Sequence, residues 1–401
     1  MGLDLIQRLH QPADTKIVLL VIDGLGGLPR GQGNTTELET ARTPNLDDLA
    51  KHSICGLHQP VSLSVTPGSG PGHLALFGYD PIDYDVGRGV LAALGIGFDL
   101  QAGDVAARGN FCTVDDEGRV SDRRAGRIAT PVNRKLCNTL KRIDIEGVRF
   151  FVETLKEYRF LLVLRGSGLR PEIANSDPQA TGALPSSPQA LVPKAKKTAN
   201  LVRRFMDAAR KRLKGQDPAN MILLRGYSQL PQWPGMKTLF GLRAAAVASY
   251  PMYRGVGALV GMEVLESGSA LPSQLQTAKK RWNDFDFFYV HVKPTDSAGE
   301  DGNFDRKVSL IEQVDGHLPQ LLELQPDVLI ITGDHSTPSV LNAHSWHPVP
   351  ALMHAAHCRP DTVERFGERA CLAGGLGPRF PATDLIPLAL ANAGRLMKYG
   401  A

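Results

Sequence analysis

The chain has 401 residues, a length that is long for one domain and suits two. With 42% hydrophobic and 21% charged residues, it can build packed cores and lacks the composition of a disordered chain. The net charge of +4 is mildly basic, but the arginines are scattered rather than gathered in one stripe. This distribution disfavours a nucleic-acid binder and favours a protein that takes a small anionic ligand.

The cysteines and the N-terminal residues indicate in which cellular compartment the protein is expected. The five cysteines are widely spaced and form no CxxC pair, which favours reduced thiols over disulfides or a structural zinc site. The first residues show no basic segment followed by an apolar one, and no run approaches the length needed to cross a membrane. We therefore expect a soluble, cytoplasmic protein without membrane or nucleic-acid partners, and the oligomeric state stays open.

The first predicted strand covers residues 16–22, an apolar run that ends at Asp23. A glycine-rich loop follows, and then a helix with Thr43 as its N-cap and Pro44 at its first position. Residues 16–105 together indicate the start of an α/β sheet.

The next informative segment is Pro67-Gly68-Ser69-Gly70-Pro71-Gly72-His73. Glycines on both sides of Ser69 let the backbone approach a ligand closely, and a helix predicted to open at Gly72 presents free N–H groups and a positive dipole end. A serine hydroxyl is a poor nucleophile unless a neighbouring cation activates it. The alternative is a tight turn whose serine merely caps the helix, and the strand-end aspartates favour the nucleophile.

The composition changes near residue 105. Residues 106–128 are rich in Arg, Gly and Asp and predict hairpin-like strands with a turn at 115–118. Residues 171–192 are rich in Pro, Ser and Gly and predict a loop. Residues 193–213 predict a basic amphipathic helix with a solvated face.

Two further strands are predicted over residues 286–292, which Asp296 follows, and 328–333, which end at Asp334. In an open parallel sheet, ligands bind beyond the carboxyl ends of the strands. Three acidic residues gathered there, Asp23 among them, are tolerable only with bound cations, so the pattern predicts metal chemistry of the kind used in phosphate transfer. Because the site joins the two ends of the chain, we expect a core formed by residues 1–105 and 235–401 and an inserted domain over 106–234.

Several histidines follow the third strand. His335 stands directly after a strand-end aspartate, and an aspartate–histidine ligand set suits Mn²⁺, Zn²⁺ or a similar ion better than an all-oxygen site for Mg²⁺ or Ca²⁺. We expect His347, His354 and His357 to be surface or supporting groups, and His291 to be a core or supporting histidine.

Together these motifs resemble the archaeal-type, cofactor-independent (2,3-bisphosphoglycerate-independent) phosphoglycerate mutases of the alkaline phosphatase superfamily. The resemblance rests on residues 21–24, 67–81, 332–338, His344-Ser345 and 348–350, with further matches at 122–127 and 253–256. It covers nearly the whole chain. It implies an alkaline-phosphatase-like α/β core with a largely parallel sheet flanked by helices, plus an inserted α+β cap domain that binds substrate.

The resemblance also implies a phosphoserine nucleophile and two metal ions. The nucleophile would be Ser69. One ion would be held by Asp23, Ser69, Asp334 and His335, and the other by Asp296, Glu300 and His344. The family usually has histidine at the position of Glu300, and the added negative charge should shift the preference toward Mn²⁺ or Mg²⁺ and away from Zn²⁺. Mn²⁺ is the expected ion, with Mg²⁺, Co²⁺ and Zn²⁺ as alternatives.

Four arginines suit a substrate that carries both a carboxylate and a phosphate, because each group accepts bidentate guanidinium contacts. The expected substrate-binding residues are Arg123, Arg165, Arg225 and Arg254, and Asp122 is the expected proton shuttle. The alternative for each arginine is an ordinary surface or salt-bridged side chain.

The reaction that the resemblance implies is the interconversion of 2-phosphoglycerate and 3-phosphoglycerate in glycolysis and gluconeogenesis, by an isomerase. A phosphohydrolase, or a mutase for another phosphorylated metabolite, is an alternative on the same core. A third alternative is a metal- or phosphometabolite-binding protein that has lost turnover through Glu300. No P-loop sequence and no dinucleotide-binding glycine spacing occurs in the chain.

Overall fold

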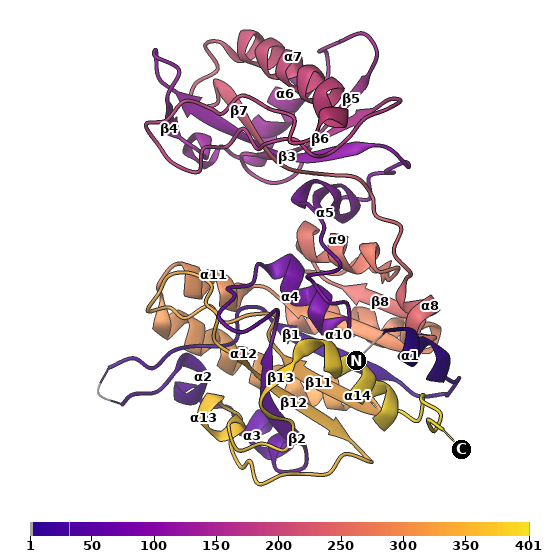
Figure 1. Cartoon of the computed structure of the whole chain (residues 1–401). Helices are drawn as coiled ribbons and strands as arrows, with labels where there is room; N and C mark the ends of the chain where they lie inside the picture. The colour runs from indigo at the N-terminus through magenta and orange to yellow at the C-terminus, as the bar shows by residue number, and fades with distance from the viewer. Residues whose placement is uncertain (1–2, 32, 401) are drawn as a thin grey trace. The chain divides into compact units, whose positions relative to one another are not determined.

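A computed structural model describes residues 3–31 and 33–400. The chain divides into two compact units (Figure 1). The first contains the residues up to Asp85 and those from Trp233 onward, and the second is Val86–Gln232.

The first unit is built on an eight-stranded sheet. In spatial order, its strands are β13 (Gly377–Pro381), β2 (Ile54–Gln59), β12 (Val349–Ala355), β11 (Val328–Thr332), β1 (Ile17–Ile22), β10 (Phe287–Val292), β8 (Ala244–Val247) and β9 (Glu263–Val264). The strands from β11 to β9 run parallel to one another. β12 is antiparallel to both β11 and β2, and β13 is parallel to β2. The sheet is therefore largely parallel.

β1 lies between β11 and β10, and its sequence Ile-Val-Leu-Leu-Val-Ile explains that position. All six residues are buried, as in strands covered on both faces by helices. β-Branched residues also favour the extended backbone. The three predicted strands that end near aspartates are confirmed as β1, β10 and β11, each to within one residue at either end.

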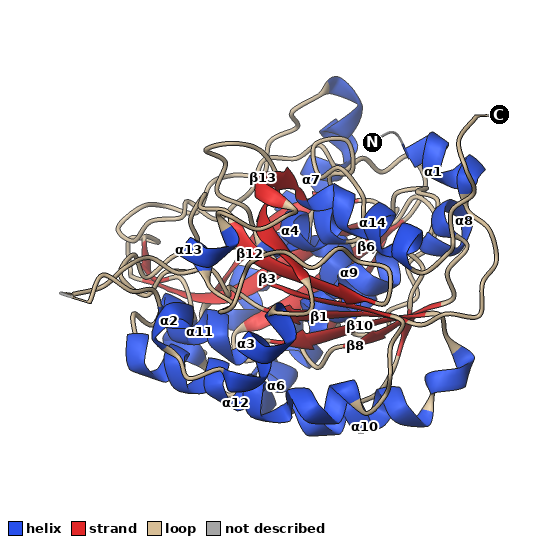
Figure 2. Cartoon of the chain, turned by 90° about the horizontal axis from the view of Figure 1, so that it is seen from below, coloured by secondary structure: helices blue, strands red, loops and turns tan. Residues whose placement is uncertain are grey.

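Helices cover both faces of this sheet (Figure 2). One face packs on α3 (Pro44–Ala50), α10 (Leu271–Lys280) and α12 (Phe304–Leu322), and α4 (Ser69–Leu76), α9 (Pro251–Leu259) and α14 (Leu385–Asn392) lie on the other. The remaining helices of this unit are α1 (Leu3–Leu9), α2 (Glu37–Thr40), α8 (Met236–Phe240), α11 (Pro294–Glu300), α13 (Glu368–Cys371) and the 3₁₀ turns η3 (Trp282–Asp284) and η4 (Ala382–Asp384).

The sequence of α12 shows how such a helix is specified. Val314, Leu318 and Leu321 recur at intervals of four and three residues, so they share one face and pack into the core beneath the sheet. The side chain of Asn303 caps the helix by accepting a hydrogen bond of 3.0 Å from the backbone N–H of Arg306. α3 also begins as predicted, with Thr43 as N-cap, but that hydroxyl makes no capping hydrogen bond.

The second unit is an antiparallel sheet with helices. Its strands are β4 (Val120–Asp122), β3 (Val105–Val114), β6 (Arg159–Arg165) and β5 (Arg149–Thr154) in this order, with β7 (Met221–Ser228) also paired to β3. Its helices are α5 (Arg88–Gly95), α6 (Thr130–Leu140), α7 (Lys196–Leu213) and the 3₁₀ turns η1 (Ala125–Arg127) and η2 (Pro193–Ala195). The hairpin predicted within residues 106–128 is confirmed as β3–β4, and the basic amphipathic helix is confirmed as α7.

The boundary between the units differs from the predicted one. The second unit begins at Val86 rather than after residue 105, because α5 packs against β3 and β7. Gly89 permits this packing, since a Cβ at that position would lie 2.1 Å from the carbonyl oxygen of Ala106. The boundary on the far side falls between Gln232 and Trp233.

The predicted fold class is confirmed: an α/β unit with a largely parallel sheet flanked by helices carries an inserted α+β unit. Across the described ranges, none of the helices combines the length and the apolar character that crossing a bilayer would require.

The carboxylate of Glu368 joins α13 to the chain around α2. It accepts hydrogen bonds from the backbone N–H of Gly27 at 2.8 Å and from Thr36 Oγ1 at 2.6 Å. Desolvation raises the pKa of Glu368 to about 7, although these hydrogen bonds oppose the shift. A carboxyl whose pKa is higher in the folded state than in the unfolded chain stabilises the fold below its unfolded pKa and loses that contribution as pH rises through the folded pKa.

We therefore expect the free energy of unfolding of the metal-free protein to fall between pH 5 and pH 8. The Glu368-dependent part of that fall should be on the order of 2 kcal/mol. Glu368→Gln should lose this part, as measured by denaturant unfolding at both pH values in a chelator. Glu364→Gln, which alters an exposed neighbour, should keep the wild-type pH dependence. Identical pH dependence in Glu368→Gln and wild type would contradict the assignment.

Candidate metal centre and nucleophile

Three predicted acidic ligands meet at one edge of the core sheet. Asp23 directly follows β1, Asp334 follows β11 after one glycine, and Asp296 lies in the first turn of α11, just after β10. Because β11, β1 and β10 are neighbouring parallel strands, their carboxyl ends lie at the same edge. Residues far apart in the sequence are thereby brought together.

Asp23, Asp334 and His335 form the first cluster, in which one ligand atom from each residue lies within 4.8 Å of the others. All three are buried. His335 Nε2 is 3.1 Å from Asp334 Oδ2 and 3.5 Å from Asp23 Oδ1. Burial alone would lower the pKa of His335, but Asp334 raises it to about 9. Conversely, burial alone would raise the pKa of Asp334, but His335 and His73 hold it well below its usual range.

Ser69 lies beside the first cluster. Its Oγ is 3.2 Å from His335 Nε2. Ser69 is the first residue of α4, with Gly68 as N-cap, so the helix begins earlier than predicted. His73 Nδ1 donates a hydrogen bond of 2.7 Å to the carbonyl of Ser69 and lies 3.1 Å from Asp334 Oδ2. The first turn of α4 is thus fixed against the strand-end carboxylate.

Asp296, His335 and His344 form the second cluster, again with ligand atoms within 4.8 Å of one another. His344 Nε2 is 3.5 Å from Asp296 Oδ1. Its Nδ1 donates to the carbonyl of Pro67 at 2.9 Å, which leaves Nε2 to face the carboxylate. The rings of His335 and His344 stack with centroids 3.7 Å apart. His335 therefore belongs to both clusters.

Glu300 lies at the edge of the second cluster. Its Oε1 is 3.8 Å from His344 Nε2, and its side chain is 55% exposed. Asp296 and Glu300 are four residues apart on α11 and so face the same side of the helix. Glu300 is next to the second cluster but outside the three residues whose ligand atoms converge.

The donor set of these clusters fits divalent cations. Among the described residues, none donates a well-formed hydrogen bond to either carboxylate oxygen of Asp23 or to Asp334 Oδ2, although all three atoms are buried. Their close neighbours are ionisable nitrogens at 3.1–3.5 Å, so these oxygens keep lone pairs that a bound cation can use. Carboxylate oxygens together with imidazole nitrogens suit Mn²⁺, Zn²⁺ and related ions.

Lys293 is a site residue that the sequence reasoning missed. Its Nζ is 3.2 Å from Asp23 Oδ2 and forms an ion pair with Asp296. Burial alone would lower the pKa of Lys293, but Asp23 and Asp296 raise it. A lysine directly after a predicted strand and three residues before a predicted ligand was the signal that could have identified it. Its ammonium offsets carboxylate charge at the strand ends.

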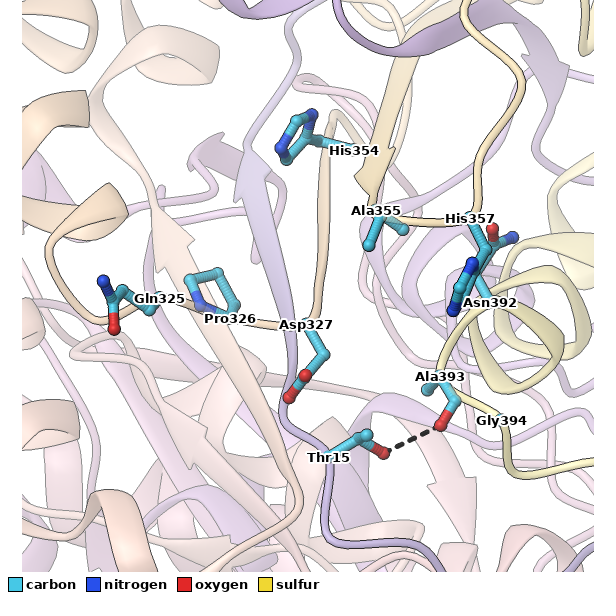
Figure 3. A pocket seen from close by; sticks show the side chains of 11 residues that line it. Thr15, Gln325, Pro326, Asp327, His354, Ala355, His357, Asn392, Ala393 and Gly394 are labelled. Carbon is cyan, nitrogen blue, oxygen red and sulfur yellow. Dashed lines mark hydrogen bonds between the residues drawn. The ribbon is translucent and has the colours of Figure 1, made fainter.

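Of the other histidines considered in the sequence analysis, one supports the first cluster and two lie at the opposite end of the sheet. His291 is buried on β10, with Nε2 3.2 Å from Asp23 Oδ2, so it supports the first cluster. His347 lies in the loop that leads into β12. His354 and His357 line a separate cavity of about 460 Å³ beside the residues that precede β1 and β11 (Figure 3). These last two are therefore at the amino ends of those strands, away from the two clusters.

Two of the predicted substrate-binding arginines meet in the second unit. Arg123 donates two hydrogen bonds to Asp177, at 2.9 and 2.8 Å. Arg225 Nη1 lies 3.7 Å from Asp177 Oδ2. Burial, and then the neighbouring charge of Arg88, lower the pKa of Arg225 to about 10. Arg88 is a basic neighbour that the sequence reasoning did not include.

The remaining two arginines have other partners. Arg165, also in the second unit, is paired with Asp104 through Nη2 at 2.6 Å. Arg254 lies on α9 of the first unit and forms an ion pair with Glu266. Neither shares a carboxylate with Arg123 and Arg225.

Asp122, the predicted proton shuttle, ends β4 in the second unit. Its two carboxylate oxygens accept hydrogen bonds from the backbone N–H groups of Arg124, at 2.7 Å, and Gly126, at 2.6 Å. In this structure the carboxylate closes the turn after the strand.

Comparisons with known proteins agree on one family. A sequence profile of 2,3-bisphosphoglycerate-independent phosphoglycerate mutase matches residues 50–220. Relatives named as probable 2,3-bisphosphoglycerate-independent phosphoglycerate mutases include one from Aquifex aeolicus, 51% identical with 100% of both chains covered, and one from Thermus thermophilus, 51% identical with 99% of this chain and 98% of the relative covered.

Solved structures show the same likeness. The PH0037 protein from Pyrococcus horikoshii has a TM-score of 0.83 and 30% identity, with 96% of this chain and 99% of that chain covered. A cofactor-independent phosphoglycerate mutase from Thermoplasma acidophilum has a TM-score of 0.71 and 30% identity, with 95% and 100% covered. With half of its residues identical over the whole length of curated relatives, the chain belongs to the 2,3-bisphosphoglycerate-independent phosphoglycerate mutase family, as its motifs predicted.

Proposed function

We propose that this chain interconverts 2-phosphoglycerate and 3-phosphoglycerate through a phosphoserine formed at Ser69. The observation that carries the proposal is the position of Ser69 Oγ, 3.2 Å from His335 Nε2 at the start of α4 and beside two carboxylate–histidine clusters. Membership of the family supports the choice of substrate. The substrate pair belongs to glycolysis and gluconeogenesis, and we propose a cytoplasmic enzyme.

Two divalent ions are part of the proposal. Asp23, Ser69, Asp334 and His335 would hold one, and Asp296, Glu300 and His344 would hold the other. When bound, the ions would supply positive charge that favours the ionised serine oxygen and the developing charge on the phosphoryl group. We propose Mn²⁺, with Mg²⁺, Co²⁺ and Zn²⁺ as alternatives, because the donor set mixes carboxylates with imidazoles.

The reaction proceeds by two displacements. Ser69 Oγ attacks the phosphorus atom, and the Ser69 O–P bond forms as the bond to the glycerate oxygen breaks. The serine proton passes to solvent. The departing glycerate oxygen takes up a proton, for which Asp122 is the proposed shuttle. The second glycerate hydroxyl then loses a proton and attacks the phosphoserine, which restores the serine hydroxyl. Substrate and product are isomers, so no co-reactant is consumed.

Positively charged groups of the chain suit the anionic substrate. The N-terminus of α4 favours negative charge at Ser69, and the ammonium of Lys293 adds positive charge beside Asp23 and Asp296. Arg123 and Arg225 are the proposed partners of the acidic groups of the substrate, because they already share a carboxylate partner in Asp177. Arg165 and Arg254 are proposed in the same role, for which each would exchange its present carboxylate partner for the substrate.

Removal of the nucleophile tests the proposal. We expect Ser69→Ala to lower turnover by a factor on the order of 10⁴ or more, because the phosphoryl group then has no acceptor on the chain. The assay couples formation of 2-phosphoglycerate to enolase, with Mn²⁺ and without 2,3-bisphosphoglycerate. Mass spectrometry of the acid-quenched wild type should find the phosphoryl group on Ser69.

Ser62→Ala is the matched control, since Ser62 is an exposed serine of the same loop and should keep wild-type turnover. Full activity in Ser69→Ala would refute the proposed nucleophile. Release of inorganic phosphate faster than formation of 2-phosphoglycerate, measured in parallel, would identify a phosphohydrolase instead.

Replacement of Glu300 tests its part in metal choice. Glu300→His removes a negative charge and adds an imidazole nitrogen beside His344, so the ratio of Zn²⁺ to Mn²⁺ affinity should rise by about tenfold. Competition titrations of the metal-free protein with the two ions measure this ratio. Glu300→Gln removes the charge without adding the nitrogen, and so separates the two effects. An unchanged ratio in both variants would show that Glu300 takes no part in holding an ion.

A further inference from the structure

Lys307 is a fully buried lysine on α12. Its Nζ donates hydrogen bonds to the carbonyl oxygens of Thr337, at 2.9 Å, and Gly26, at 3.1 Å. A carboxylate oxygen, Glu37 Oε1, lies 3.9 Å from Nζ and is also buried. Burying an ammonium costs several kcal/mol unless its charge and its donors are satisfied. The two backbone carbonyls and Glu37 therefore supply the partners that make the buried ammonium of Lys307 tolerable.

The two carbonyl groups belong to the segments that carry the first cluster. Gly26 lies three residues after Asp23, and Thr337 lies two residues after His335. The segments also contact each other directly, since the backbone N–H of Thr337 donates to the carbonyl of Gly26 at 3.0 Å. The ammonium of Lys307 thus fixes both segments just beyond the proposed ligands.

The side chain of Thr337 reaches both clusters. Its Oγ1 lies 2.7 Å from Asp296 Oδ1 and 3.0 Å from His335 Nδ1. An ionised carboxylate can only accept, so the single hydroxyl proton is donated to Asp296 and Nδ1–H of His335 donates to Thr337. This assignment leaves Nε2 of neutral His335 without a proton and free to bind an ion.

Close packing keeps Thr337 in place. A Cβ at Gly24 would lie 2.6 Å from Thr337 Oγ1, and a Cβ at Gly299 would lie 2.3 Å from the carbonyl oxygen of Thr337. Glycine at both positions lets the backbone approach the threonine this closely. A shift of Thr337 would therefore be transmitted to the residues that it contacts.

We propose that Lys307 is a positioning residue of the metal centre, which acts through Thr337 to orient His335 of the first cluster and Asp296 of the second. The inference rests on the metal binding that forms part of the proposed function. Lys307 fixes the backbone of Thr337, and the hydroxyl of Thr337 fixes one ligand of each cluster. The competing explanation is that Lys307 only balances Glu37 and stabilises the fold, without any effect on the ions.

The test is the dissociation constant of Mn²⁺, measured by titration calorimetry on the metal-free protein. Loss of an outer group that orients a ligand typically weakens metal binding by about 10–100-fold, which is the loss we expect for Lys307→Met and for Thr337→Val. Thr337→Ser keeps the hydroxyl and should bind Mn²⁺ like the wild type. Because Lys307 acts through Thr337, the two losses should not add. The double variant Lys307→Met/Thr337→Val should bind Mn²⁺ no more weakly than whichever single variant has the higher dissociation constant.

Arg395→Met is the matched control for loss of a buried cation. Arg395 is 3% exposed, donates to the carbonyl of Thr15 at 2.7 Å and lies 3.6 Å from Asp286, all at the amino ends of the strands. Its removal should lower the melting temperature and leave the Mn²⁺ dissociation constant within about twofold of the wild-type value.

A Lys307→Met protein that melts earlier, as the control does, but binds Mn²⁺ within about twofold of wild type would overturn the inference. If Lys307→Met does not fold, the test uses Lys307→Arg instead, together with the comparison of Thr337→Val and Thr337→Ser. Equal Mn²⁺ binding by wild type, Lys307→Arg and Thr337→Val would then overturn it. A wild-type protein that binds no Mn²⁺ would refute the proposed metal centre itself, and that outcome is distinct from normal binding in all variants.

Discussion

Three carboxylates held out of water at neighbouring strand ends are the constraint on which the rest of the structure depends. Asp23 and Asp334 are fully buried and Asp296 is 1% exposed. Like charges at such separations repel strongly where solvent cannot screen them. In the structure described here, the ammonium of Lys293 offsets part of this charge, and the imidazole of His335 lies 3.1 Å from Asp334. In the working enzyme we assign the neutralisation of this charge to divalent ions. The same ions would then stabilise the folded site and take part in phosphoryl transfer.

The backbone around the site is arranged to let these groups approach one another. A Cβ at Gly72 would lie 2.4 Å from the carbonyl oxygen of Asp334, so a side chain there would push α4, and Ser69 with it, away from the first cluster. Lys307 then joins the segments after β1 and β11 from beneath. The serine, the carboxylates and the histidines owe their geometry to such contacts as much as to the parallel strands.

Much of the fold and the site followed from the sequence, for identifiable reasons. The strands before Asp23 and Asp334 are continuous apolar runs, which strands buried on both faces require, so their ends could be located to within one residue. The start of α4 was missed because glycine and proline dominate its first turn and are poor helix formers. Lys307 was missed because its contacts involve carbonyls and a carboxylate far away in the sequence, which no local pattern reveals. Lys293 was missed although one of its partners, Asp296, follows it by only three residues. The pairing of Arg254 with Glu266, which are twelve residues apart, was likewise not predicted.

Anomalous diffraction at the manganese absorption edge, from crystals of the protein loaded with Mn²⁺, tests the central claim most directly. We predict two peaks about 3.5–4 Å apart, the first among Asp23, Asp334 and His335 and the second beside Asp296 and His344. A single peak, or peaks away from the carboxyl ends of β1, β10 and β11, would contradict a two-metal centre at these strand ends.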